Sequence, residues 1–152
     1  ILLSGTVAEN LQYGDCTPIM VFRPDSPSRN RFGGKLGPLL NRDAGERGRA
    51  LSGGERQLVV ADRLSWRDSA VWLLDEPTSA MDAETERTVM DWLLGEKKNH
   101  IIFMATHKLS LAARFDRILV LHHGKIVQDG THAELVKEDG LYQRLWRLQE
   151  VV

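Results

Sequence analysis

The stretch "LSGGERQLVVADRL", residues 51–64, predicts a helix with two glycines in its first turn. Ser52 is a favoured N-cap residue, and Glu55 at the third helical position completes a capping box, in which each side chain accepts a bond from the other residue's backbone N–H. The box does not explain Gly53 and Gly54, because glycine destabilises a helix relative to alanine. Without a Cβ, both glycines would let an anion approach the helix N-terminus closely. The stretch alone therefore fits a capped helix and also a phosphate site.

The composition indicates a single globular domain over residues 1–152. Of these residues 42% are hydrophobic and 27% are charged, and the net charge is -1, so no global field favours nucleic acid or an anionic membrane. Residues 23–49 carry seven basic against three acidic side chains. Such a run is more often a solvated loop than a binding patch, and we expect no nucleic-acid partner. Cys16 is the only cysteine, which excludes an internal disulfide and fits a reducing compartment.

The sequence predicts neither a membrane span nor a signal peptide. No apolar run approaches the roughly 18 residues that a span requires. The chain begins with Ile1 and not with Met, so we expect a fragment or a processed chain.

After residue 48, apolar runs of strand length alternate with amphipathic helices. The runs at 71–74 and 101–105 are apolar throughout, which predicts strands buried on both faces. Helices are expected at 52–66 and from Asp82, as N-cap, to Gly95; the second should bury Val89, Met90, Leu93 and Leu94. This alternation predicts an α/β fold with a mostly parallel sheet flanked by helices.

The two ends of the chain carry weaker signals. A short helix capped near Ser4 or Thr6 should end at Gly14, and the proline-rich residues 15–45 should be mostly irregular. Towards the C-terminus we expect a short helix near 110–114, two strands joined by a tight "HHGK" turn, a second capping box, and a helix with a leucine stripe. The box pairs Thr131 with Glu134, and the stripe comprises Leu141, Leu145 and Leu148.

The run at 71–74 leads directly into Asp75 and Glu76. Burying carboxylates is costly unless they have a partner or a purpose, although two acids before Pro77 could simply cap the following turn. In the functional interpretation Asp75 holds hydrated Mg²⁺, and Glu76 takes a proton from an attacking water. His107 follows the next strand, where the carboxyl ends of parallel strands share one edge. A lone histidine is commonly structural, but this position favours the site.

Three further histidines could suggest a metal site. His122 and His123 precede a glycine in the expected hairpin turn, and His132 lies nearby in the sequence. Histidine pairs in turns are commonly exposed to solvent, and no cysteine or acid cluster completes a ligand set.

Four motifs in order resemble ATP-binding cassette (ABC) transporter ATPases. "LSGGERQ" resembles the signature motif, "VWLLDEPTSAMD" the Walker B motif and D-loop, and "MATHKLS" the switch-histidine loop. "AGERGRALSGG" resembles the X-loop of exporters, "SGTVAENLQYG" the segment after the Q-loop, and residues 116–149 the C-terminal end of the domain. The resemblance implies a partial P-loop NTPase fold of the exporter subclass, in which residues 15–44 form a divergent helical subdomain and residues 45–152 carry the motifs.

The resemblance also implies roles for individual residues. Ser52, Gly53, Gly54 and the adjoining Glu55 would face the γ-phosphate of an ATP held by a second ATPase domain. Asp75 would organise Mg²⁺. The other expected site residues are the general base Glu76, the γ-phosphate contact His107, the D-loop residues Ser79 and Asp82, and Glu46 in the X-loop.

The chain departs from the family pattern at its phosphate cradle. No G-x-x-x-x-G-K-[ST] motif occurs, since Gly33-Gly34-Lys35 is followed by leucine. Glu55 replaces the usual glutamine, and Leu58 and Asp62 replace a usual basic residue and a usual alanine. We expect the 152 residues alone to be inactive, because catalysis requires ATP to be positioned first.

Two functions follow from these signals. The first is the ATP-binding and ATP-hydrolysing part of an exporter, coupled through a transmembrane domain and located at the cytoplasmic face of the plasma membrane. The alternative is a catalytically inactive remnant or partner half that only pairs with a complete ABC ATPase. Both require a second ATPase domain, ATP and Mg²⁺.

Overall fold

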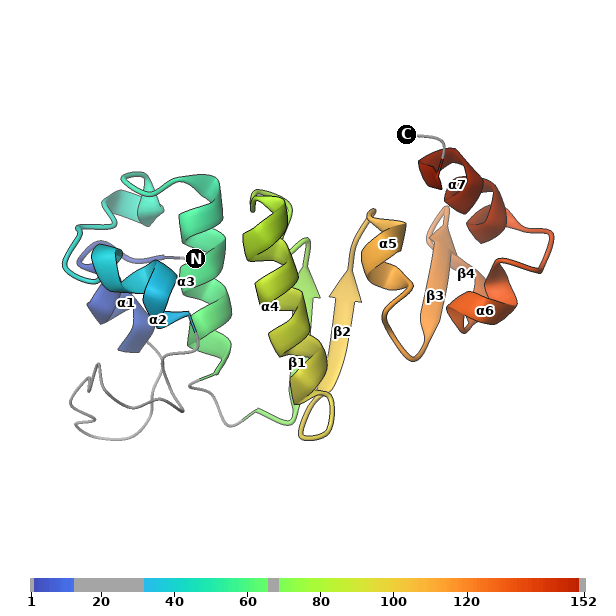
Figure 1. The fold of residues 1–152 in the computed structure, drawn as a ribbon, viewed down its shortest axis with the longest axis horizontal. Helices are drawn as coiled ribbons and strands as arrows, with labels where there is room; N and C mark the ends of the chain where they lie inside the picture. The colour runs from blue at the N-terminus through green and yellow to red at the C-terminus, as the bar shows by residue number, and fades with distance from the viewer. Residues whose placement is uncertain (1, 13–31, 66–68, 151–152) are drawn as a thin grey trace. The chain divides into compact units, whose positions relative to one another are not determined.

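The computed structural model describes residues 2–12, 32–65 and 69–150 and divides the chain into two compact units, Ile1–Phe103 and Met104–Val152. Each unit is described by itself. Figure 1 shows the order of the helices and strands along the chain. Their alternation confirms the α/β class expected from the sequence. None of the described helices is long and apolar enough to cross a membrane.

The first unit begins with helix α1 (Val7–Gln12), which packs against α3 (Gly53–Leu64). Thr6 and Glu9 exchange capping bonds at the start of α1, so Thr6, one of the two expected caps, begins this helix. Its expected end at Gly14 lies outside the described residues. Between α1 and α3 lie the helix α2 (Gly33–Leu36) and two 3₁₀ turns, η1 (Gly37–Leu39) and η2 (Glu46–Gly48).

A buried polar contact joins α1 to α3. Asn10 and Arg63 are only 2% and 8% exposed, respectively. Arg63 donates from Nε to the Asn10 carbonyl oxygen at 2.9 Å and from Nη2 to Asn10 Oδ1 at 3.2 Å. The same helix buries Leu58 and Asp62, the two positions at which its sequence departs from the family pattern. A buried charge needs such partners, so the contact fixes how these helices meet.

Helix α4 (Ala83–Glu96) begins where the sequence predicts, because the Asp82 side chain accepts a bond from Thr85 N. Two details of the expectation are wrong. Gly95 does not end the helix, which continues to Glu96: a glycine stops a helix by adopting a left-handed backbone, and Gly95 does not adopt one. Leu94 is only half-buried, whereas Leu93 on the core side is buried.

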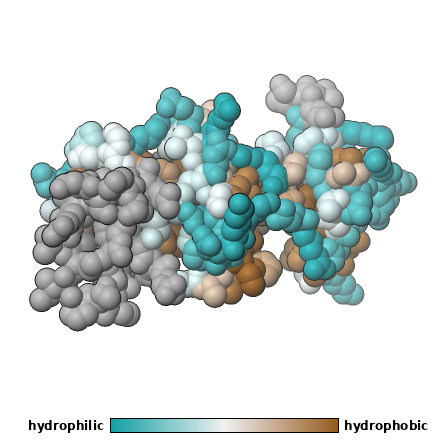
Figure 2. Space-filling view, turned by 60° about the horizontal axis from the view of Figure 1, so that its bottom comes forward, coloured by the Kyte–Doolittle hydropathy of each residue, from teal (hydrophilic) through white to brown (hydrophobic). Residues whose placement is uncertain are grey.

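Strands β1 (Val71–Asp75) and β2 (Ile101–Ala105) pair side by side, and Figure 1 draws both arrows pointing the same way. The expectation that both faces are buried is wrong. Trp72 is 3% exposed and packs against Trp92 of α4, whereas the alternate residues are exposed; these are Val71, Leu73, Ile101 and Phe103. Figure 2 shows apolar atoms in brown at this part of the surface. Among the described residues, side chains of this pair are buried on the α4 side alone.

The second unit is built on an antiparallel hairpin of β3 (Ile118–His122) and β4 (Lys125–Gly130), as expected. The turn residues His123 and Gly124 have φ of 48° and 75°. Positive φ at both positions is the geometry of the tight turn that matches strand twist. His123 therefore belongs to this turn, whereas His122 is the last residue of β3.

Three helices accompany the hairpin: α5 (Leu109–Ala112), α6 (His132–Leu135) and α7 (Leu141–Glu150). The predicted capping box begins α6. The predicted leucine stripe of α7 is buried only in part: Leu141 packs against the core cluster, whereas Leu145 and Leu148 are 40% and 69% exposed. Tyr142, which is 1% exposed, packs with Ile118 and Val120 of the hairpin and is the most buried residue of α7.

Candidate functional site

The capping box at the start of α3 is present. Ser52 Oγ accepts a hydrogen bond from Glu55 N at 3.2 Å, and Glu55 Oε2 accepts one from Ser52 N at 2.6 Å. The first N–H groups of a helix have no intrahelical partner, and here they belong to the two glycines and Glu55. The box satisfies the N–H of Glu55. The helix start therefore presents the N–H groups of Gly53 and Gly54.

The two glycines of α3 pack against the loop that follows β1. A Cβ on Gly53 would lie 2.9 Å from Ala80 Cβ, and one on Gly54 would lie 2.9 Å from the Ala80 carbonyl oxygen. Contacts this short force a shift, and at Gly54 the obstacle is backbone. Close packing within the chain thus accounts for both glycines, a reason that the sequence could not provide.

Gln57 bridges α3 and the same loop. Its Nε2 donates to the Glu76 carbonyl oxygen at 3.0 Å and to Ser79 Oγ at 2.9 Å. Its Oε1 accepts from Ala80 N at 2.9 Å. One amide therefore connects the start of α3 to the turn that carries Glu76. The sequence-based set of site residues omitted Gln57, although it is the last residue of the "LSGGERQ" motif.

The two carboxylates lie at the end of β1. Asp75 is the last residue of the strand and is exposed. Glu76 is half-buried and has φ of 44°, in the left-handed region, which costs roughly 1–3 kcal/mol for a residue with a side chain. Its carbonyl oxygen accepts from Gln57 and, at 3.3 Å, from Ser79 N. These bonds stabilise the strained backbone and so determine the direction of the chain after β1.

A cavity of ≈ 320 Å³ adjoins the carboxylates within the first unit. Asp75 and Glu76 line it together with Gln57 and two arginines, Arg47 and Arg56, and most of its other lining is aliphatic. Acidic and basic side chains therefore line the same cavity.

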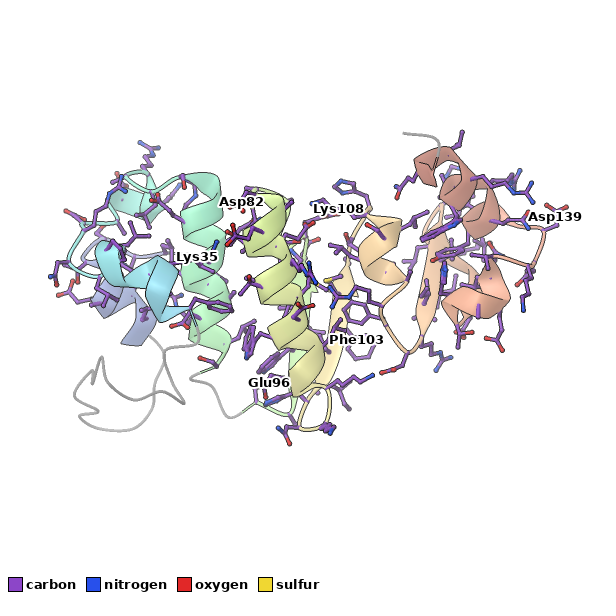
Figure 3. The ribbon with its side chains drawn as sticks, viewed as in Figure 1. Lys35, Asp82, Glu96, Phe103, Lys108 and Asp139 are labelled. Carbon is purple, nitrogen blue, oxygen red and sulfur yellow. The ribbon has the colours of Figure 1, made fainter. Side chains whose placement is uncertain are left out.

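The other two expected loop residues have structural partners. Ser79 Oγ accepts from Gln57. Asp82 accepts from Thr85 N at 2.9 Å and from Thr85 Oγ1 at 2.7 Å. The Thr85 backbone bond is the largest cause that lowers the pKa of Asp82, and nearby Lys35 adds to it. Figure 3 shows Lys35 directed towards this end of α4, where its Nζ donates to Thr85 Oγ1 at 2.9 Å.

His107 belongs to the second unit and follows β2. Its side chain is exposed, and its carbonyl oxygen accepts from Gln149 Nε2 at 3.0 Å. The first unit thus brings together Ser52–Glu55, Asp75, Glu76, Ser79 and Asp82, whereas His107 belongs to the second unit.

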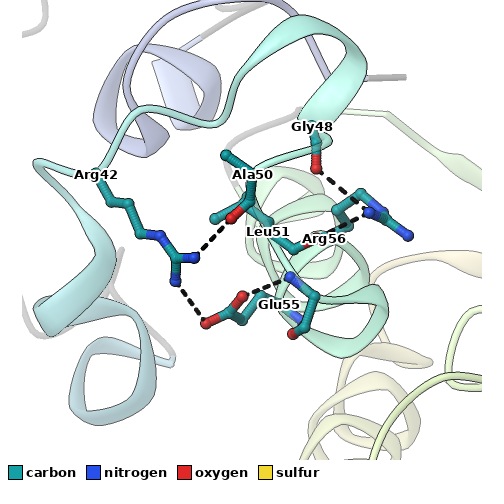
Figure 4. Close-up of polar contacts among 7 residues, drawn as sticks. Arg42, Gly48, Ala50, Leu51, Glu55 and Arg56 are labelled. Atoms are coloured by element: carbon teal, nitrogen blue, oxygen red, sulfur yellow. Dashed lines mark hydrogen bonds and ion pairs between the residues drawn. The ribbon is translucent and has the colours of Figure 1, made fainter.

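Two arginines donate hydrogen bonds to groups at the start of α3 and in the segment just before it (Figure 4). Arg42 donates to Glu55 Oε1 at 3.2 Å and to the Ala50 carbonyl oxygen at 2.6 Å. Arg56 donates to the carbonyl oxygens of Gly48 at 3.3 Å and Leu51 at 2.8 Å. The pKa of Glu55 is lowered, first by the Ser52 backbone bond and also by Arg42, while burial acts against the shift.

The donor set fits a magnesium nucleotide. No group of three or more His, Cys, Asp or Glu in the described part of the chain could hold a metal ion by itself. Mg²⁺ instead commonly binds one or two carboxylates together with substrate phosphates, and the exposed Asp75 has the chemistry of such a ligand. The N–H groups of Gly53 and Gly54 suit phosphate oxygens. The residues present therefore fit both groups.

Comparison with known proteins identifies similar chains. A family model described as "ABC transporter" matches residues 24–79. An uncharacterized ABC transporter ATP-binding protein of Haemophilus influenzae is 39% identical over 93% of this chain, and an ATP-dependent lipid A-core flippase of Vibrio vulnificus is 42% identical over 78%. A solved bacterial Atm1-family ABC exporter with ATP bound matches 99% of the chain at 30% identity, with a TM-score of 0.86.

This chain is short beside those relatives. It covers 21% of the Haemophilus protein, 20% of the Vibrio flippase and 27% of the solved exporter chain. The similarity therefore concerns one part of a much longer architecture.

Proposed function

The chain belongs to the ABC transporter family of ATP-binding domains, and from that premise we propose that it supplies the signature motif and catalytic acids of an exporter ATPase. The single observation that carries the proposal is the bridge of Gln57. It holds the start of α3 beside the turn of Glu76, Ser79 and Ala80. The start of α3, which is able to bind phosphate, is thus rigidly connected to the turn of Glu76, which is able to activate water.

Each part of the site has a chemical task. Ser52, Gly53 and Gly54 bind the γ-phosphate of an ATP held by a second ATPase domain. Asp75 holds Mg²⁺, which when bound neutralises phosphate charge. Glu76 accepts a proton from water while the water oxygen bonds to the γ-phosphorus and the bond to ADP breaks. His107 contacts the γ-phosphate, and Ser79 and Asp82 belong to the loop that joins the two sites.

The partners follow from the same proposal. Hydrolysis drives export through a transmembrane domain, so the ATPase lies at the cytoplasmic face of the plasma membrane. The solved relative is an exporter with ATP bound, which supports this assignment. The second ATPase domain completes each site, because the phosphate-binding end of α3 and the base Glu76 serve different nucleotides.

A substitution of the base tests the proposal. The natural protein is purified from its own cells through a C-terminal tag, and Mg-ATP hydrolysis and ATP binding are measured separately. We expect Glu76→Gln to abolish turnover while ATP binding stays within about twofold, since the amide keeps the size and loses the base. Glu84→Gln is the matched control, because Glu84 is an exposed carboxylate at the start of α4 in the same unit.

The result separates the two functions. Turnover unaffected by Glu76→Gln would remove Glu76 as the base. The natural protein could instead bind no ATP alone and bind ATP only together with a complete ABC ATPase. That result would favour the non-catalytic partner half.

A further inference from the structure

Glu55 carries a negative charge in the first turn of α3. This N-terminal end of the helix is the one proposed to bind phosphate. The Glu55 carboxylate lies within hydrogen-bond distance of Ser52, beside the N–H groups of Gly53 and Gly54. An uncompensated anion in this position would repel a phosphate through the same field that the helix dipole makes attractive. The site therefore needs a cation that cancels Glu55.

Arg42 supplies that cation. It lies 13 residues before Glu55, and its Nη1 meets Glu55 Oε1 at 3.2 Å. The two side chains are 48% and 27% exposed, so the pair is partly shielded from solvent. The carboxylate is thus held between Ser52 N on one side and a guanidinium on the other (Figure 4).

The same guanidinium also orients the backbone. Arg42 Nη2 donates a hydrogen bond to the Ala50 carbonyl oxygen at 2.6 Å. Arg56 donates to the carbonyl oxygens of Gly48 and Leu51. Carbonyl oxygens repel phosphate as carboxylates do. With these acceptors occupied by arginines, donor groups predominate at the open end of the helix.

We propose that Arg42 is a positioning residue for the phosphate end of α3: it cancels the charge of Glu55, so that Ser52, Gly53 and Gly54 can receive a nucleotide phosphate. The inference rests on the proposed function and deepens it. Arg42 acts through Glu55 and does not itself touch the nucleotide.

A double-mutant cycle in the natural protein tests this role. Arg42→Gln leaves Glu55 uncompensated, and we expect the ATP concentration at half-maximal turnover to rise about tenfold, the effect of losing one charge-assisted hydrogen bond, with kcat within about twofold. Glu55→Gln provides the background in which Arg42 has no carboxylate to cancel, while the amide oxygen still accepts the Ser52 bond. The double variant should return to the level of Glu55→Gln.

The rescue is decisive, because a merely structural loss of the Ala50 bond would persist in the double variant. Arg117→Gln is the matched control: Arg117 pairs with Asp129 in the second unit at 2.6 Å, and its loss should leave ATP dependence unchanged. An equal effect of Arg42→Gln with glutamate or glutamine at position 55 would overturn the proposal.

A second measurement is independent of hydrolysis. Tripolyphosphate is titrated into the chain while the amide NMR signals of Gly53 and Gly54 are followed. We expect Arg42→Gln to weaken tripolyphosphate binding and Glu55→Gln to restore it. If the Glu76 experiment fails but this pattern appears, the phosphate role of Arg42 stands without the ATPase function; if Arg42→Gln has no effect here, the inference is wrong even where ATP is hydrolysed.

Discussion

Gln57 Nε2 donates a hydrogen bond of 3.0 Å to the carbonyl oxygen of Glu76, 19 residues further along the chain. The acceptor belongs to a residue with a left-handed backbone at the end of β1. Two more bonds from the same side chain reach Ser79 and Ala80. A displacement of α3 is therefore transmitted directly to the backbone of the proposed base.

Replacing Gln57 by alanine should weaken the first unit and misplace Glu76. Loss of three hydrogen bonds, of which the one to the Glu76 carbonyl oxygen is partly buried and the other two are exposed, is expected to cost about 2 kcal/mol of unfolding free energy. Urea unfolding of the chain measures this cost. Gln143→Ala is the matched control: the Gln143 amide donates one hydrogen bond to the Val136 carbonyl oxygen, and its loss should cost about 1 kcal/mol. Equal losses in the two variants would contradict a bridging role for Gln57.

Much of the fold follows from local sequence signals. The caps at Ser52, Asp82 and Thr131 were predictable, because a cap depends on residues within one turn of each other. The exposure of Leu73 and Leu148 was not, since an apolar residue is buried only if another element covers it. The tight turn at His123 was also predictable from the sequence.

The candidate site was predictable in its residues and not in its connections. Asp75 and Glu76 stand out because they follow an apolar strand. Gln57 and Arg42 bind groups that are distant in sequence, and no spacing rule reveals such contacts. The packing of Gly54 on Ala80 likewise depends on how α3 meets a loop 26 residues away.

The glycines of α3 provide a second stability test. Gly54→Ala should destabilise the chain by about 1–3 kcal/mol, because its Cβ would meet the Ala80 carbonyl oxygen at 2.9 Å. Gly95→Ala is the control: nothing lies within 4 Å of that Cβ, and alanine should stabilise α4 by roughly 0.5–1 kcal/mol. Thermal or urea unfolding measures both.

Gly53 allows a rescue experiment. Gly53→Ala should also destabilise, since its Cβ would lie 2.9 Å from Ala80 Cβ. Removing the obstacle with Ala80→Gly should recover part of the loss in the double variant. A double variant whose loss equals the sum of the two single losses would mean that these two atoms do not determine the fit.

The contact between Asn10 and Arg63 should dominate the docking of α1. Asn10→Ala removes both acceptor oxygen Oδ1 and the amide that donates to the Leu3 and Thr6 carbonyl oxygens. Because Arg63 is buried, we expect a loss of about 3 kcal/mol in unfolding free energy. Asn41→Ala, at an exposed position, should change stability by less than about 0.5 kcal/mol. Similar values for the two variants would show that the buried contact adds little.

Acid should destabilise the second unit through its capping box. The pKa of Glu134 is lowered, first by the Thr131 backbone bond and then by the Thr131 hydroxyl. A carboxyl whose folded pKa lies below its unfolded value stabilises the protein above the unfolded pKa, and this stability is lost as pH falls through the folded pKa. The ordinary value is 4.5, so the loss should begin near that pH and grow below it. Unfolding monitored by tryptophan fluorescence, measured from pH 7 downwards, should show a flatter acid profile for Glu134→Gln than for the unchanged chain. Glu138→Gln removes the same charge three residues beyond the end of α6 and should keep the original slope. A slope unchanged by Glu134→Gln would mean that the box does not link folding to proton binding.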